Sequence, residues 1–254
     1  GVFTVIETSL ATLYGKGVFT SIKVSEAKPF LWEKHWRRLV ENSAKLRIDI
    51  SEYSERAVSD SLVELIEKNQ TINGRARITF HDASPSELWS GGGEKKTSLS
   101  IITAEQRKIP ANFKLTNSPY LVNSTSPLAG VKSCNYLDHL LTLDESKKRG
   151  FDEAVRVNER GEITSGCMAN VFWSKDEKLF TPSLKTGCLA GTTREFVLEN
   201  VECKEVETGI DALTKADSIF LTSTGIGVVQ VAEFDGRSLE NQDHPIIDLV
   251  PRVV

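Results

Sequence analysis

The 254-residue sequence lacks several features that would narrow its class at once. It contains no apolar run near the about 18 residues that a membrane-spanning helix needs, and its first ten residues do not have the basic start and apolar core of a signal peptide. A net charge of -4 offers no basic footprint for nucleic acid or an anionic membrane. We therefore expect a soluble, cytoplasmic protein with no nucleic-acid or membrane partner.

Cysteine and nucleotide-binding motifs are equally scarce. The four cysteines, at positions 134, 167, 188 and 203, form no C-x-x-C pair, which argues against a zinc site and against a dense disulfide framework. We expect free thiols and no bound metal. The phosphate-binding pattern G-x-x-x-x-G-K-[ST] is also absent.

Apolar spacing predicts the elements of the first half of the chain. Helical periodicity covers residues 31–48 and 54–69, and strand-like runs cover 74–82 and 97–103. The stretch 117–130 is rich in Ser, Asn and Pro, which is typical of a connector.

The second half alternates helices and strands. The expected elements are helices over 135–148 and from 191 onward, and strands over 153–158, 163–166, 170–173, 178–181 and 218–224. These patterns predict three parts: a small N-terminal α+β domain over 1–118, a connector over 119–130 and a larger C-terminal domain over 131–254.

Glycine and hydroxyl residues gather before one predicted helix. In "TGCLAGTTR" (186–194), Gly191, Thr192 and Thr193 precede an amphipathic run. The first N–H groups of a helix, with its positive dipole end, can bind a phosphate. Threonine is also a common N-cap, and that purely structural interpretation remains open. "LTSTGIG" (221–227) offers further hydroxyls at a strand end.

A lysine supplies the second observation. Lys132 follows a Pro- and Gly-containing loop and precedes Asn135 and Tyr136. A lysine is usually a solvated surface charge, but one placed inside a site can lose its proton and form a Schiff base with an aldehyde. A lysine, a phosphate cradle and a hydroxyl-rich loop together point to pyridoxal 5'-phosphate.

The motifs "VKSCNY", "TSGCMANVFW", "TPSL" and "GCLAGTTR", with "LYGKGVF" and "LTSTGIGVVQV" near the two ends, resemble the class IV aminotransferases. These are fold-type IV pyridoxal phosphate enzymes: branched-chain aminotransferase, D-amino acid aminotransferase and aminodeoxychorismate lyase. The resemblance implies an α/β (α+β) fold of two domains, like that of D-amino acid aminotransferase. It also implies a small amino-acid-like substrate and a homodimer.

By position, the resemblance makes Lys132 the Schiff-base lysine. It implies a phosphate site made of Arg38, Thr192, Thr193 and Thr224, a bond from Tyr136 to the phenolic oxygen of the cofactor, and a substrate pocket lined by Tyr14 and Phe19. Sequence alone leaves open whether Arg37 or Arg38 points inward, although the family's H-x-x-R-L pattern favours Arg38.

One position departs from the family. Ser165 stands where the family has a glutamate that pairs with the pyridine nitrogen of the cofactor and keeps it protonated. Glu162 is the nearest acid, and on a regular strand a residue three positions away points to the opposite face. We therefore expect Ser165 to meet the ring, which would then stay unprotonated.

An unprotonated ring is a weaker electron sink, so protonation at the cofactor carbon, which transamination needs, should suffer more than the loss of a leaving group. This favours an aminodeoxychorismate lyase, which makes 4-aminobenzoate and pyruvate in folate synthesis. A branched-chain or D-amino acid aminotransferase is the alternative. A protein that holds the cofactor without catalysis is the third reading.

A second departure concerns the substrate. The lyases and D-amino acid enzymes have an Arg-Gly pair after the strand "GRARI", where this chain has Asp82 and Ala83. Arg77 and Arg75 are candidates to bind a substrate carboxylate, with His81 as a weaker one. An exposed strand face explains all three residues equally well.

Overall fold

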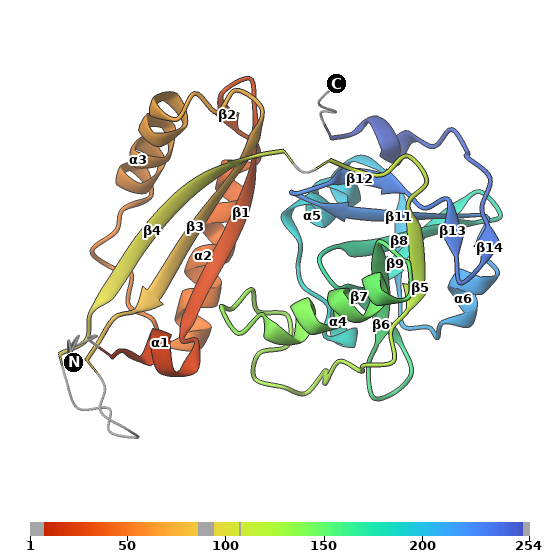
Figure 1. Cartoon of the computed structure of the whole chain (residues 1–254), viewed down its shortest axis with the longest axis horizontal. Coiled ribbons are helices and arrows are strands. Elements are labelled where there is room, and N and C mark those ends of the chain that lie inside the picture. Colours follow the sequence, from red (N-terminus) through yellow and green to blue (C-terminus); the bar gives the residue numbers. More distant parts are fainter. Residues whose placement is uncertain (1–7, 86–93, 107, 251–254) are drawn as a thin grey trace, which may run out of the picture. The chain divides into compact units, whose positions relative to one another are not determined.

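The computed structural model describes residues 8–85, 94–106 and 108–250, and the chain forms two compact units (Figure 1). The small unit comprises the described residues up to Gln106 together with Val131–Tyr136. The large unit comprises the residues from 108 to Gly130 and from Leu137 onward. Each unit has its own core and is described by itself.

The small unit is an antiparallel sheet with the strand order β2-β1-β3-β4 and three helices. Its elements are α1 (Leu10–Tyr14), β1 (Gly17–Ser25), β2 (Lys28–Pro29), α2 (Trp32–Leu46), α3 (Glu55–Lys68), β3 (Gly74–Asp82) and β4 (Thr97–Glu105).

Strict alternation along β3 fixes which face of this sheet meets the helices. Ala76, Ile78 and Phe80 are buried with Leu39 of α2 and Leu62 of α3 in one core. Because successive strand residues point to opposite faces, the alternate residues of β3 lie on the other face of the sheet, where burial is only partial. That second face carries the candidate arginines.

The lysine segment is attached to β1. The Phe19 N–H donates to the Lys132 carbonyl (3.0 Å), the Cys134 N–H donates to the Gly17 carbonyl (2.8 Å), and Val18 and Ser133 form an antiparallel bridge. The six residues 131–136 thus group with the small unit, whereas residues 108–130 group with the large one. The predicted division into a domain over 1–118, a connector over 119–130 and a domain over 131–254 stays a prediction, because a compact unit is not by itself an independent domain.

The large unit contains two five-stranded sheets, ordered β10-β9-β8-β11-β12 and β14-β13-β5-β6-β7. Its strands are β5 (Lys114–Asn117), β6 (Glu153–Val157), β7 (Ile163–Gly166), β8 (Asn170–Lys175), β9 (Lys178–Pro182), β10 (Cys203–Val206), β11 (Ser218–Ser223), β12 (Gly227–Gln230), β13 (Glu233–Phe234) and β14 (Arg237–Ser238). Its helices are α4 (Leu137–Lys148), α5 (Thr192–Asn200) and α6 (Asp211–Thr214), with the short 3-10 turns Leu184–Thr186 and Pro245–Asp248.

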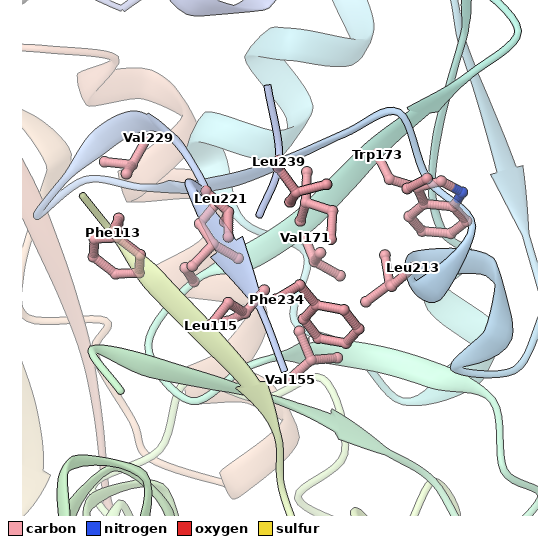
Figure 2. Close-up of a cluster of buried hydrophobic side chains, with 14 of the residues drawn as sticks. Phe113, Leu115, Val155, Val171, Trp173, Leu213, Leu221, Val229, Phe234 and Leu239 are labelled. Carbon is pink, nitrogen blue, oxygen red and sulfur yellow. The ribbon is translucent and has the colours of Figure 1, made fainter. Parts of the chain in front are cut away.

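The core of the large unit joins its two sheets (Figure 2). Leu115 and Val155 come from one sheet and meet Val171 and Leu221 from the other, with Phe234 of β13 among them. All five are at most 2% exposed. Burying each such side chain contributes roughly 1.5–3 kcal/mol, so this core holds both sheets that carry the candidate site.

The predicted elements are largely confirmed. The periodic runs 31–48 and 54–69 form α2 and α3, and the strand patterns 74–82 and 97–103 form β3 and β4. The helix expected from residue 135 begins at Leu137. Among the described residues, no helix combines the length and apolar character that crossing a membrane requires.

Candidate active site

Lys132 lies in a small aromatic enclosure of the small unit. Its Nζ donates to the Tyr136 hydroxyl at 3.1 Å and lies 4.7 Å from the centre of the Phe19 ring and 4.9 Å from that of the Tyr136 ring. The two rings meet edge to face at 5.1 Å. Three predicted site residues are thus brought together around one amine.

The charge around Lys132 makes this amine unusual. Burial, followed by the positive charges of Arg38 and Arg77, lowers the pKa of Lys132 to about 7. Lys132 therefore loses its proton far more readily than an exposed lysine does. A neutral amine is the form that attacks an aldehyde and the form that accepts a proton, so the enclosure prepares Lys132 for either role.

Arg38 is fixed by a chain of polar contacts inside the small unit. Its Nη2 donates to the Thr20 hydroxyl at 2.7 Å, and that hydroxyl lies 2.7 Å from His35 Nδ1. An arginine can only donate, so the Thr20 oxygen accepts from Arg38 and keeps a second lone pair and its own proton for the contact with His35 Nδ1. The pKa of His35 is lowered well below the usual range by burial and then by the positive charges of Arg38 and Lys132, which favours the neutral imidazole.

The structure distinguishes the two adjacent arginines of α2. Arg38 is 8% exposed, whereas Arg37 lies on the exposed face of the helix. Helical geometry explains the difference, because adjacent residues are about 100° apart around the helix. Arg38 points inward with His35, three positions earlier.

The substrate candidates of β3 separate in the same way. The Arg77 guanidinium lies over the Phe19 ring, 3.7 Å from its centre, beside the lysine enclosure. Arg75, two positions away on the same face, donates instead to the Glu105 carbonyl at the sheet edge. His81 lies opposite Gly17 on β1, and Tyr14 is 38% exposed at the end of α1. Arg77 and Phe19 thus lie beside Lys132, and the substrate role of Tyr14 stays a prediction.

The large unit carries the second group of candidates at the start of α5. Gly191 is the N-cap and gives no side-chain cap, while Thr192 and Thr193 are buried in the first turn. A side chain at position 191 would collide with Asn170 Oδ1. The amide of Asn170 is itself fixed, because its Nδ2 donates to the Leu189 carbonyl at 2.9 Å. The helix start is therefore a rigid set of N–H groups and hydroxyls.

Strand β11 adds a hydroxyl to this end of the large unit. Thr222 is 1% exposed, and within the part of the chain that the structure describes its Oγ1 has no hydrogen-bond partner. It lies two positions after Phe220, on the face that packs against Val197 of α5. Thr224 follows in the turn and is half-buried. A buried hydroxyl without a partner costs free energy, which marks a place for a polar ligand.

Ser165 lies on β7 directly opposite Arg156 of β6. It is 8% exposed, and its hydroxyl makes no hydrogen bond to any residue that the structure describes. The expectation that Glu162 points to the opposite face assumed regular alternation. The register of β6 and β7 shifts between Arg156 and Val157, so alternation alone does not fix the face of Glu162, and the expectation stays a prediction.

Glu162 is kept from acting near Ser165 by its own partners. Its Oε2 accepts from Asn158 Nδ2 at 2.8 Å and from Arg160 Nη2 at 2.7 Å, in the turn that joins β6 to β7. The carboxylate is therefore held by the hairpin itself. That the Ser165 hydroxyl meets the cofactor in place of the family's carboxylate stays a prediction.

The sequence model for "Amino-transferase class IV" matches residues 17–234. The chain belongs to this family. Class IV aminotransferases are pyridoxal phosphate-dependent enzymes, so the expected enzyme class, the α/β (α+β) fold of fold-type IV and the cofactor are confirmed at the level of the family. The match spans both units, including every predicted site residue except Tyr14.

The chain is similar to family members with different names. It is 27% identical over 232 residues to an aminodeoxychorismate lyase of Bacillus subtilis (strain 168), which covers 88% of this chain and 79% of the relative. It is 28% identical over 255 residues to a putative branched-chain-amino-acid aminotransferase of Methanocaldococcus jannaschii, covering 91% and 82%. A putative 4-amino-4-deoxychorismate lyase structure from Legionella pneumophila aligns with a TM-score of 0.84 and 26% identity, covering 94% and 90%.

The described residues fit the cofactor of this family. The small unit provides an amine with a pKa of about 7 beside two guanidinium groups, which suits an aldehyde on an anionic ligand. The large unit provides an uncapped helix start and the unpartnered Thr222 hydroxyl, which suit phosphate oxygens. These donor sets are complementary to pyridoxal phosphate without any metal ligand being needed.

Sequence reasoning missed several polar residues of these two groups. In the sequence, Thr20 is one hydroxyl residue within an apolar strand. Its hydrogen bond to Arg38, 18 positions away in the sequence, is visible only in the folded structure. His35 was visible as the first residue of the H-x-x-R-L pattern. Thr222 was visible in the hydroxyl-rich "LTST" run. No feature of the sequence indicated that Arg156 lies near Ser165, because that proximity depends on the register between β6 and β7.

Proposed function

We propose that the protein is an aminodeoxychorismate lyase, which releases 4-aminobenzoate and pyruvate and serves folate synthesis. The observation that carries this proposal is the polar pair at the position where the family has its glutamate: a hydroxyl from Ser165, with Arg156 opposite, and no carboxylate. The lyases among the similar proteins support the same reading.

In this proposal the small unit manages the proton. Lys132, neutral near pH 7, holds the cofactor and takes or returns a proton at Nζ. The Tyr136 hydroxyl, 3.1 Å away, keeps that nitrogen in place and interacts with the phenolic oxygen of the cofactor. Arg38, held by Thr20, is the cation for the phosphate. Bound pyridoxal phosphate supplies the electron sink for the carbon that carries the substrate's amino group.

The large unit, on the same proposal, fixes the cofactor without charge. Thr192 and Thr193 offer the N–H groups and hydroxyls of the α5 start to the phosphate, with Thr224 beside them. Thr222 adds the buried hydroxyl. That both groups of residues serve one cofactor rests on the family resemblance.

The chemistry follows from the partner of the ring nitrogen. A carboxylate there stabilises a pyridinium by opposite charge, and a hydroxyl does not. With a weaker sink, expulsion of a leaving group from the neighbouring carbon is favoured over protonation of the cofactor carbon. The lyase reaction needs the first step and transamination needs the second, so the residues at this position favour the lyase.

The substrate is small and amino-acid-like, and Arg77 is placed to bind its carboxylate. The guanidinium lies over Phe19, beside the amine of Lys132. We also retain from the resemblance a cytoplasmic homodimer with Tyr14 at the substrate pocket.

An aminotransferase is the second candidate, and the similarity to a putative branched-chain-amino-acid aminotransferase favours it. A protein that holds the cofactor without catalysis is the third, with Ser165 as the lesion. The neutral Lys132 argues against the third, because an inactive site has no use for a reactive buried amine.

One assay separates the three. Purified holoenzyme is given aminodeoxychorismate in one series and glutamate with branched-chain 2-oxo acids, or D-alanine with 2-oxoglutarate, in the others. The lyase proposal predicts release of 4-aminobenzoate and pyruvate in equal amounts and little new amino acid. Formation of a new amino acid without 4-aminobenzoate would establish the aminotransferase. No product in any series would favour the inactive protein.

A further inference from the structure

The guanidinium of Arg156 is a buried cation beside Ser165. Arg156 and Ser165 are directly opposed on antiparallel strands, so their side chains leave the sheet on the same face, with Cβ atoms about 4.5–5.5 Å apart. The Arg156 side chain is only 4% exposed. Its Nε has no hydrogen-bond partner among the described residues.

The neighbours of Arg156 do not cancel this charge. Its Nη1 pairs with Asp138 Oδ2 of α4 at 2.7 Å, but the Asp138 side chain is 65% exposed, so water screens the carboxylate more than the arginine. His139 Nδ1 lies 2.7 Å from the Cys167 carbonyl and 3.0 Å from Arg156 Nη2. The carbonyl requires a donor and the arginine an acceptor, so Nδ1 can satisfy only one of them. When Nδ1 carries the proton, His139 Nε2, 3.4 Å from Arg156 Nη2, is the remaining acceptor for the arginine, and a neutral imidazole does not neutralise the guanidinium.

The remaining acids near this strand pair are committed elsewhere. Glu153 Oε1 accepts from the N–H groups of Cys167 and Met168, at 2.5 and 3.2 Å. Along the regular part of β6 it points to the face opposite Arg156. Glu162 is held by Asn158 and Arg160, as described above. The charged group that lies opposite Ser165 on the face they share is therefore the Arg156 guanidinium, which pairs with Asp138.

We propose that Arg156 is a positioning residue that acts through Ser165 to keep the pyridine nitrogen of the cofactor unprotonated. This inference rests on the proposed function, which places the cofactor ring at Ser165. Because a guanidinium repels a pyridinium, the Ser165 hydroxyl donates to the ring nitrogen instead of receiving a proton from it. Where the family has a carboxylate that keeps the pyridine nitrogen protonated, this chain thus has a pair, Ser165 and Arg156, that keeps the proton off that nitrogen.

The test observes the ring nitrogen itself. Holoenzyme is prepared with pyridoxal phosphate isotope-labelled at the ring nitrogen, and nitrogen NMR follows that signal across the pH range in which the protein is folded. The wild type, Arg156→Met, Arg156→Lys and Arg160→Met are compared. Arg160 is the matched control, because it lies in the same β6–β7 hairpin and pairs with Glu162.

The wild type should show an unprotonated nitrogen at neutral pH. Arg156→Met should raise the pH at which the nitrogen becomes protonated by about one unit or more. Arg156→Lys, whose ammonium can still pair with Asp138, should keep the wild-type signal, and Arg160→Met should not shift it. A purely structural arginine would not move this signal.

Three results would overturn the inference, and they differ in what else they overturn. An unchanged signal in Arg156→Met contradicts this inference alone and leaves the proposed lyase to the product assay. A bound cofactor with a protonated ring nitrogen in the wild type contradicts this inference and also removes the electronic argument for the lyase, whose activity the product assay then decides separately. Failure to take up pyridoxal phosphate at all contradicts the proposed function, and the inference falls with it. The wild-type spectrum decides the matter even if the methionine variant does not fold.

Discussion

The two units present candidate ligand-binding groups of different electrostatic character. The small unit crowds cations, because Arg38 and Arg77 both act on Lys132 and lower its pKa to about 7. The α5 end of the large unit relies on neutral donors: the N–H groups of its first turn and the hydroxyls of Thr192, Thr193 and Thr222. On the proposed function, this difference predicts that pH controls cofactor attachment at Lys132, whereas phosphate binding at the α5 end changes little with pH.

The largest effect should come from Lys132. Lys132→Ala removes the only buried amine of the described aromatic enclosure, so covalent attachment of pyridoxal phosphate and turnover should both be abolished. Absorbance of the bound cofactor and product formation measure the two losses. Turnover retained in this variant would contradict the role given to the small unit.

Arg38 should have the next largest effect. A charge-assisted hydrogen bond is worth about 1.5–3 kcal/mol, so Arg38→Ala should weaken pyridoxal phosphate affinity by roughly 10- to 150-fold. Titration of the cofactor-free protein measures this. Arg37→Ala, on the exposed face of the same helix, is the control and should leave affinity unchanged. An equal loss of cofactor affinity in both variants would contradict this account, because it would show that the inward orientation of Arg38 on α2 does not matter.

The cofactor-free protein should become more stable as pH rises. The pKa of Lys132 is about 7 in the folded protein and about 10.4 when unfolded. Between these values the unfolded chain binds more protons, so the free energy of unfolding should rise by up to about 1.4 kcal/mol per pH unit. Denaturant titrations at several pH values measure the slope. Lys132→Met should remove this contribution and the exposed Lys28→Met should not; equal slopes would show that Lys132 titrates normally.

Arg77 should have a smaller effect on the same amine. Its positive charge lowers the pKa of Lys132, so Arg77→Leu should raise that pKa and move the midpoint of cofactor attachment to higher pH. The pH dependence of the attachment rate reports the midpoint. Arg75→Leu is the matched control, because Arg75 lies on the same strand face but donates to the Glu105 carbonyl. A shift in the opposite direction would contradict the electrostatic account.

Replacing Thr222 should have the smallest effect on cofactor affinity, and it should not lower the stability of the cofactor-free protein. Thr222→Val removes a buried hydroxyl that has no partner within the described chain, so the cofactor-free protein should be as stable or more stable. Cofactor affinity should fall roughly threefold to tenfold. Thr181→Val offers the contrast: its hydroxyl donates to the Val171 carbonyl at 2.8 Å, so stability should fall while affinity is kept. Unchanged affinity in Thr222→Val would remove this hydroxyl from the phosphate group.

Local patterns predicted most elements and the motif residues. Periodicity placed α2, α3 and β3 because burial on one face dictates the spacing of apolar residues. Resemblance singled out Lys132, Arg38 and Thr192, and Arg38 lies inward while Arg37 does not. The ligand roles of these residues stay predictions until the cofactor is measured.

Long-range register explains what the sequence did not reveal. Thr20 meets His35 and Arg38 only because β1 packs under α2. Arg156 lies opposite Ser165 only because a bulge shifts the β6–β7 pairing, and a period-two reading cannot detect a bulge. The same shift means that strand alternation alone does not fix the face of Glu162.

The most direct test of the account identifies the lysine that holds the cofactor. Holoenzyme is reduced with borohydride and digested, and the modified peptide is found by mass spectrometry. Lys23 is the natural competitor, because it is 4% exposed and burial lowers its pKa, but it lies outside the aromatic enclosure. The account predicts that the cofactor is attached to Lys132 alone. Attachment at Lys23, or at no lysine, would contradict it.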